Sequence, residues 1–121
     1  MVQNRFIKWR APIESLWTRN GISIHIKRDD LMDPLISGNK IFKLKENIKA
    51  FRSGSFETVV TFGGAYSNHI AATAALCREE NIACVGIIRG ERIVPLNPTL
   101  AKAEAQGMKL TFVPRNIYRK R

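Results

Sequence analysis

Two short segments hold the residues most able to do chemistry. Ser37-Gly38-Asn39-Lys40 leads into an amphipathic stretch, and residues 63–69 (Gly-Gly-Ala-Tyr-Ser-Asn-His) follow an apolar run. A lysine in a partly desolvated place has a lowered pKa and can form a Schiff base with an aldehyde. Paired glycines allow close backbone approach, and N–H groups at a helix start can hold an anionic group. Together the two segments favour a site for an anionic carbonyl cofactor.

Each segment also has a purely structural explanation. Lys40 could be a solvated lysine in the first turn of a helix, and Ser67 or Asn68 could simply cap the next helix. Lysines in such positions are more often structural, so the prediction depends on the two segments converging in space. The second segment has neither the G-x-G-x-x-G nor the G-x-x-x-x-G-K-[ST] form, which argues against a nucleotide site.

Composition and charge exclude several classes of protein. The net charge is +10, and residues 115–121 carry four of the basic side chains, but no recognition helix, stacking platform or finger motif accompanies them. We therefore expect no nucleic-acid partner. Cys77 and Cys84 have neither C-x-x-C spacing nor a histidine cluster nearby, which indicates reduced, packed thiols and no metal site. The apolar runs are far shorter than the roughly 20 residues of a membrane span, so we expect a cytoplasmic protein with no membrane partner.

The periodicity of apolar residues predicts an α/β fold. Isoleucines alternate with polar residues over 22–27, which predicts a strand with one buried face. Apolar residues at helical spacing predict a helix that begins at Asn39 and ends before Ser53-Gly54. The remaining elements are expected as strands over 58–62, 83–88 and 109–113, with helices over 67–80 and 97–106. This alternation implies right-handed βαβ units and a parallel sheet, in which the strand 83–88 is covered on both faces.

Taken together, the motifs resemble one enzyme family. Residues 26–31 (Ile-Lys-Arg-Asp-Asp-Leu), 37–40 and 63–69 are similar to motifs of the 1-aminocyclopropane-1-carboxylate deaminase and D-cysteine desulfhydrase family. The similarity extends over 86–91, 97–100, 107–108 and 118–119. Members of this family are pyridoxal-phosphate enzymes of the tryptophan-synthase-β fold, also called fold type II, and the chain resembles their N-terminal part.

The resemblance implies a role for each candidate residue. Lys40 would bind pyridoxal 5'-phosphate as a Schiff base and later move the α-proton of a small amino-acid substrate. Asn68 would donate a hydrogen bond to the phenolic oxygen of the cofactor and lie beside the substrate. Ser67 would assist proton transfer or bind the substrate carboxylate, and the turn at His69 would help to hold that carboxylate.

The resemblance also implies an incomplete enzyme. Residues 1–53 would form the N-terminal part of the large cofactor domain, and residues 54–121 the first βα units of the small domain, truncated where another helix is expected. In the family, the phosphate loop and the partner of the pyridine nitrogen come from the C-terminal half. We therefore expect a fragment of a deaminase or desulfhydrase that is inactive alone and needs a complementing chain or a homo-oligomer. The alternative is a non-catalytic α/β module that binds a partner chain through its incomplete sheet.

Overall fold

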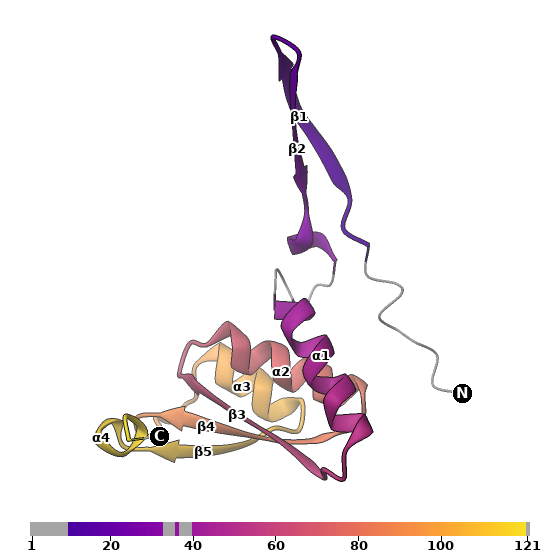
Figure 1. Ribbon diagram of the computed structural model, residues 1–121. Coiled ribbons are helices and arrows are strands. Elements are labelled where there is room, and N and C mark those ends of the chain that lie inside the picture. The colour runs from indigo at the N-terminus through magenta and orange to yellow at the C-terminus, as the bar shows by residue number, and fades with distance from the viewer. Residues whose placement is uncertain (1–9, 33–35, 37–39, 121) are drawn as a thin grey trace.

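The computed structural model describes residues 10–32, 36 and 40–120. Two parts are visible in Figure 1, a projecting hairpin near the N-terminus and an α/β unit that contains the rest of the described chain. The elements of the hairpin part are β1 (Ile13–Arg19), β2 (Ile22–Lys27) and the 3₁₀ turn η2 (Asp29–Leu31). The α/β unit consists of α1 (Lys40–Ser53), β3 (Thr58–Gly64), α2 (Asn68–Glu79), β4 (Ala83–Arg89), α3 (Pro98–Ala105), β5 (Lys109–Val113) and α4 (Arg115–Tyr118).

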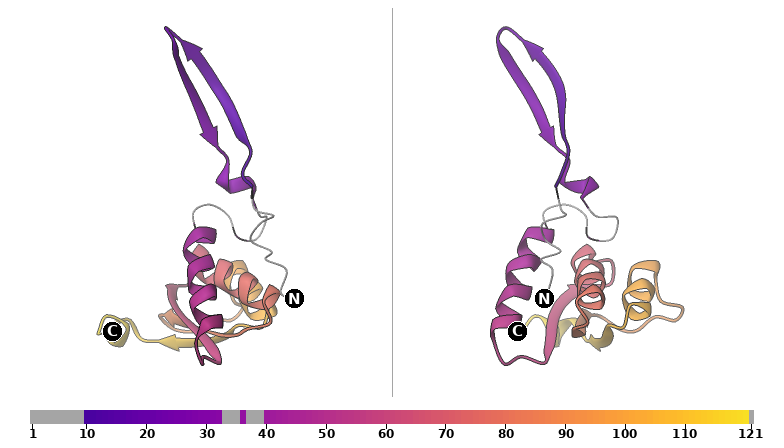
Figure 2. Two further views of the ribbon diagram at one scale, coloured as in Figure 1. Left: turned by 45° about the vertical axis from the view of Figure 1, so that its right-hand side comes forward. Right: turned by 90° about the vertical axis from the view of Figure 1, so that its right-hand side faces the viewer.

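The α/β unit is a three-stranded parallel sheet in the order β3-β4-β5. Helix α2 connects β3 to β4 and α3 connects β4 to β5, and both helices lie on the same face of the sheet (Figures 1 and 2). Parallel neighbours need such crossover connections, because the chain has to return to the starting edge. The predicted α/β fold with a parallel sheet is therefore confirmed.

Local sequence signals set the ends of the helices. The Ser67 hydroxyl accepts a hydrogen bond from the Ile70 N–H and caps α2, and the Asn97 side chain accepts from the N–H groups of Thr99 and Leu100 at the start of α3. Gly107 has a φ of +96° after α3, a conformation that glycine adopts without a steric penalty. The expected helix limits are thus correct to within a residue or two.

Helix α1 packs onto α2 rather than onto the sheet. Ile41, Leu44 and Ile48 are buried in one cluster with residues of α2, chiefly Ala75 and Leu76. A second cluster lies between α2, α3 and the sheet, and its buried members are Ile70, Ala74, Cys77, Cys84, Ile88, Leu100, Ala103 and Met108. Helices α1 and α2 thus share one hydrophobic cluster, although they lie on opposite sides of the expected domain boundary between residues 53 and 54. The division into two domains stays a prediction.

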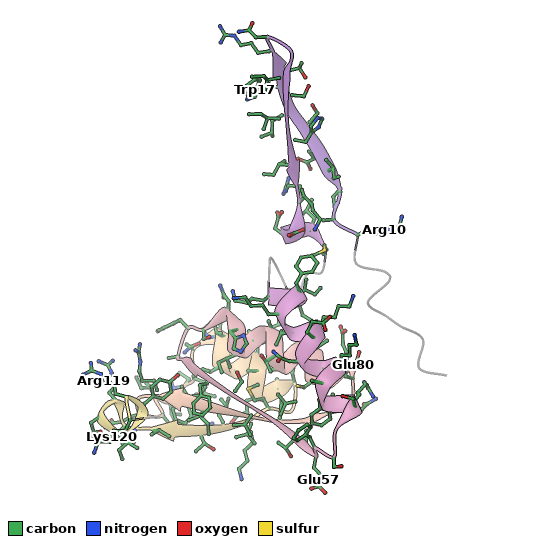
Figure 3. All side chains as sticks on the ribbon, in the orientation of Figure 1. Arg10, Trp17, Glu57, Glu80, Arg119 and Lys120 are labelled. Carbon is green, nitrogen blue, oxygen red and sulfur yellow. The ribbon has the colours of Figure 1, made fainter. Side chains whose placement is uncertain are left out.

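The hairpin corrects one expectation and adds a strand. Strand β2 matches the predicted strand 22–27, but its isoleucine face is not buried, since Ile22 is 62% exposed and Ile26 is 40% exposed. Strand β1 was not predicted, and it pairs with β2 in antiparallel fashion through Asn20 and Gly21, which both have positive φ. At the base of the hairpin, Lys27 Nζ lies over the Phe42 ring of α1, 4.7 Å from the ring centroid, whereas Figure 3 shows Trp17 far from the α/β unit. The alternation specifies which face can be buried, whereas burial itself requires a covering element.

The same reasoning corrects the expectation for β4. Cys84, Gly86 and Ile88 are buried against the helices, but Val85 and Ile87 on the other face are only half-buried. On that face the Tyr118 ring of α4 lies edge-on to the Phe62 ring, with 6.2 Å between the ring centroids. Coverage on both faces is therefore wrong for the described part of the chain. In the same part, no helix has the length and apolar character needed to cross a membrane.

Candidate functional site

The glycine segment forms a tight turn at the carboxyl end of β3. The Ser67 N–H donates to the Gly64 carbonyl at 3.1 Å, which closes the turn between the strand and α2. Gly63 lies so close to this turn that a Cβ there would be 2.5 Å from Ile70 Cγ1 and 2.9 Å from Ser67 Oγ. Only glycine allows that approach, so Gly63 has a steric role. The turn brings Ser67, Asn68 and His69 to the start of α2, as the sequence predicted.

The start of α2 presents polar groups that could bind an anion. Ser67 is the N-cap, Asn68 is the first helical residue and is exposed, and His69 is half-buried. The first N–H groups of a helix have no acceptor within it, and this end of the helix dipole is positive. The N–H groups of Asn68 and His69 therefore lie where they can hold a carboxylate or a phenolate oxygen.

His69 connects this turn to the sheet and to α1. Its Nε2 is 2.8 Å from Thr61 Oγ1, and Thr61 is buried on β3. Burial lowers the pKa of His69 below its ordinary value of 6.5, and the positive charges of Lys40 and Lys43 lower that pKa further. The imidazole is therefore mostly neutral at neutral pH. The sequence did not single out Thr61, although a threonine on the helix-facing side of β3 is a signal for such a contact.

Lys40 is the first residue of α1 and is half-buried. Its positive charge contributes to the lowered pKa of His69, near the start of α2. At the other ends of the two helices, the Arg52 guanidinium pairs with the Glu80 carboxylate and also donates to the Glu80 carbonyl. Both helices therefore begin at the same end of the pair. Ser37, Gly38 and Asn39 lie outside the described residues.

A cavity of about 320 Å³ lies beside this arrangement, between α1, β3 and α2. Its polar lining residues are Asn47, Thr61, His69 and Thr73, and the rest of the lining is mostly apolar. Neither Lys40 nor Asn68 lines it. The cavity therefore reaches only the rear of the candidate site, where His69 contacts Thr61.

The two cysteines lie away from the lysine. Cys77 and Cys84 are free thiols in the second hydrophobic cluster. The hydrogen bond that the Cys77 S–H donates to the neighbouring Cys84, together with burial, raises the pKa of the Cys77 thiol. Among the described residues, no group of three or more His, Cys, Asp or Glu side chains gathers as a metal ion would require.

Comparisons with known proteins agree in pointing to one group of enzymes. No family model matches the chain. A Pyrococcus abyssi protein with the provisional name 1-aminocyclopropane-1-carboxylate deaminase is 36% identical over 99 residues, which cover 79% of this chain and 30% of that protein. The D-cysteine desulfhydrase of Salmonella paratyphi B is 33% identical over 91 residues, which cover 74% of this chain and 26% of that enzyme.

Solved structures agree with the sequence comparison. A crystal structure of an ACC deaminase homologue has a TM-score of 0.70 and 28% identity, and the match covers 87% of this chain and 33% of that one. A hydrogen sulfide-producing enzyme from Fusobacterium nucleatum has a TM-score of 0.64 at 15% identity, over 98% of this chain and 39% of that one, and supports the fold alone. The expected resemblance and fold class are confirmed. The chain spans about 30% of the length of the curated relative with 36% identity.

Proposed function

We propose that this chain supplies the lysine-bearing part of a pyridoxal-phosphate site that acts on a small amino acid, of the 1-aminocyclopropane-1-carboxylate or D-cysteine type. The observation that carries the proposal is the packing of α1 beside α2, with the Arg52–Glu80 ion pair joining their C-terminal ends, so that Lys40 and Ser67 begin the two helices at the same end. A primary amine, an exposed amide on Asn68 and the positive end of a helix thus lie in one region. This donor set suits an aldehyde that carries anionic oxygens.

Each residue would have its own role in such a site. Lys40 would attach the cofactor through its amine and, once released, take or give the proton on the α-carbon of the substrate. Asn68 would donate to the ring oxygen of the cofactor, and Ser67 with the first N–H groups of α2 would hold the substrate carboxylate. His69 is held by Thr61 and would add a neutral hydrogen-bonding group to the turn. When bound, the cofactor supplies an electron sink for the charge that develops on the α-carbon.

We also propose that the 121-residue chain does not turn over substrate alone. The matches cover only 16–30% of the curated proteins, so most of each related protein has no counterpart in this chain. Charge-assisted hydrogen bonds to a phosphate contribute roughly 1.5–3 kcal/mol each, and the described residues offer only part of such a set. We expect weak cofactor binding and no steady release of ammonia or sulfide unless a complementing chain is added.

Borohydride trapping tests the site directly. Pyridoxal phosphate is titrated into the chain, the mixture is reduced with borohydride, and peptide mass spectrometry locates the modified lysine. We expect preferential labelling of Lys40 at low cofactor concentration. Lys40→Arg should remove this label, whereas Lys43→Arg should keep it, because Lys43 is an exposed cation on the same turn and serves as a matched control. Equal labelling of both lysines, in proportion to concentration, would contradict the proposal.

The exposed apolar residues favour a second candidate, a module that binds a partner chain without catalysis. Val60 is 55% exposed and Phe62 is 42% exposed on the open face of the sheet, and several residues of the hairpin are similarly exposed. Large exposed apolar patches mark interaction surfaces. Light scattering after gel filtration, on the chain alone and with candidate partners, tests this function. A tight complex whose formation is unaffected by Lys40→Arg, together with no trapped cofactor, would favour the second candidate over the first.

A further inference from the structure

Asn97 connects two parts of the molecule that are distant in the sequence. Its Oδ1 accepts hydrogen bonds from the N–H groups of Thr99 at 3.0 Å and of Leu100 at 3.1 Å, as expected of an N-cap. Its Nδ2 donates to the Ala65 carbonyl at 2.9 Å, across 32 residues of sequence. One side chain therefore caps α3 and at the same time holds the turn that leads into α2.

The hydrogen-bond pattern determines the orientation of this amide. Two backbone N–H donors face one atom and a carbonyl faces the other, so only the arrangement with Oδ1 towards α3 satisfies all three contacts. Ala65 is the second residue of the turn that the Ser67 N–H closes onto the Gly64 carbonyl. Because the peptide bond is planar and trans, holding the Ala65 carbonyl also directs the N–H of Tyr66 away from Asn97.

Next to the Asn97 contact, the turn borders a cavity and solvent. A cavity of about 160 Å³ lies next to the contact, and Ala65, Tyr66, Asn97 and Leu100 are among the residues that line it. Tyr66 itself is 78% exposed. Ala65 packs against the hydrophobic cluster, but the cavity and the exposed Tyr66 leave the other side of the turn open, so the directed hydrogen bond from Asn97 contributes to fixing its geometry.

We infer that Asn97 is a positioning residue, which sets the geometry of the Gly64–Ser67 turn from the start of α3 and thereby aims Ser67 and Asn68. Asn97 itself touches neither Lys40 nor a ligand in this role. The value of this positioning for cofactor binding rests on the proposed function above, but the structural link does not.

The two roles of Asn97 can be separated by substitution. Asn97→Asp keeps an oxygen acceptor for the cap of α3 and even suits the positive end of that helix, but it cannot donate to the Ala65 carbonyl at neutral pH. Asn97→Ala removes both the cap and the donor. Thr99→Asp adds a carboxylate at the same helix start while leaving Asn97 in place, and is the control for the added charge.

Amide hydrogen exchange and carbonyl chemical shifts, measured by NMR on the full chain without cofactor, test the inference. In Asn97→Asp we expect the N–H groups of Ser67 and Ile70 to exchange about 2- to 10-fold faster, as the loss of one such hydrogen bond implies, with the α3 amides unchanged. The carbonyl carbon of Ala65 should shift in the same variant. Thr99→Asp should change neither readout, and Asn97→Ala should also loosen α3.

Two results would overturn the inference: wild-type exchange and an unshifted Ala65 carbonyl in Asn97→Asp, or equal changes in Asn97→Asp and Thr99→Asp. If Asn97→Ala does not fold, Asn97→Asp still decides between the outcomes, because it retains the cap. Borohydride trapping on the wild-type chain separates this question from the proposed function. Faster exchange in Asn97→Asp without labelling of Lys40 in the wild-type chain would support the inference and reject the proposed function. Labelling of Lys40 with unchanged exchange in Asn97→Asp would support the proposed function and reject the inference.

Discussion

Replacing Gly63 by alanine tests whether the turn depends on the close approach of β3 to α2. The new Cβ would lie 2.5 Å from Ile70 Cγ1 and 2.9 Å from both Cβ and Oγ of Ser67. Ile70 is completely buried in the cluster between the helices and the sheet, so it has little room to withdraw. Ser67 is the N-cap of α2, so any movement of it weakens that cap. The substitution therefore strains the core and the candidate site at once.

The expected loss of stability follows from the contacts of the new Cβ with Ile70 and Ser67. Overpacking of a well-packed core destabilises by about 1–3 kcal/mol, and partial loss of an N-cap contributes up to about 1 kcal/mol more. Gly64→Ala is the matched control, because the nearest atom to its Cβ would be Arg89 Nη2 at 3.7 Å, an ordinary contact. Losing a glycine at a compatible position stabilises by about 0.4–1 kcal/mol through the unfolded state. The two neighbouring alanines should thus differ by at least about 1.5 kcal/mol in opposite directions.

Urea-induced unfolding followed by circular dichroism measures this difference. We expect a lower urea midpoint for Gly63→Ala than for the wild type, and an equal or higher midpoint for Gly64→Ala. The slope of the free energy of unfolding against urea concentration should be the same in all three proteins. In the borohydride experiment, Gly63→Ala should also reduce labelling of Lys40, since displacement of Ser67 disturbs the site. Equal stability of the two variants would refute the reasoning, because it would mean that β3 and α2 separate without a penalty.

Three further predictions concern single side chains. Because burial and two lysines lower the pKa of His69 in the folded chain, the free energy of unfolding should fall as the pH drops below 6.5, and His69→Gln should flatten that dependence in urea titrations at several pH values. Ser67→Ala should destabilise the chain by about 1 kcal/mol in the same assay, whereas Ser67→Asp should keep the cap. Cys77 should resist iodoacetamide at pH 8 until denaturant is added, as mass spectrometry can show, because its hydrogen bond to Cys84 and its burial raise its pKa.

The parallel sheet and its helices were predictable because their signals are local. The largely β-branched run over 58–62, the cap at Ser67 and the Asn97-Pro98 pair each specify an element within a few residues. The first strand of the hairpin gave no such signal, because the apolar residues before Asn20 do not alternate cleanly, and β1 carries a register shift between Ser15 and Trp17. Burial of the hairpin could not be predicted either, since it depends on what packs against it.

The contacts that complete the candidate site join residues that no local pattern connects. Thr61 contacts His69 from the strand before the turn, and Asn97 contacts Ala65 from the start of α3. The Thr61 contact forms because the tight turn folds α2 back onto β3, and the Asn97 contact forms because the α2 crossover makes β3 and β4 parallel neighbours, with their carboxyl ends at one edge of the sheet. The sequence could indicate Ser67, Asn68 and the cap at Asn97. The contacts of Thr61 with His69 and of Asn97 with Ala65 become visible only in the assembled fold.

The electrostatics of the site follow from the way α1 and α2 pack. Both helices begin at the same end, so the positive end of α2 adds to the charges of Lys40 and Lys43 around His69. Burial and the two lysine charges make a further cation unfavourable there, so the imidazole stays neutral and keeps its contact with Thr61. An anion is favourable for the same reason, because it offsets all three sources of positive potential. The packing that makes His69 a poor base therefore makes its turn a good place for a carboxylate or a phenolate beside the lysine.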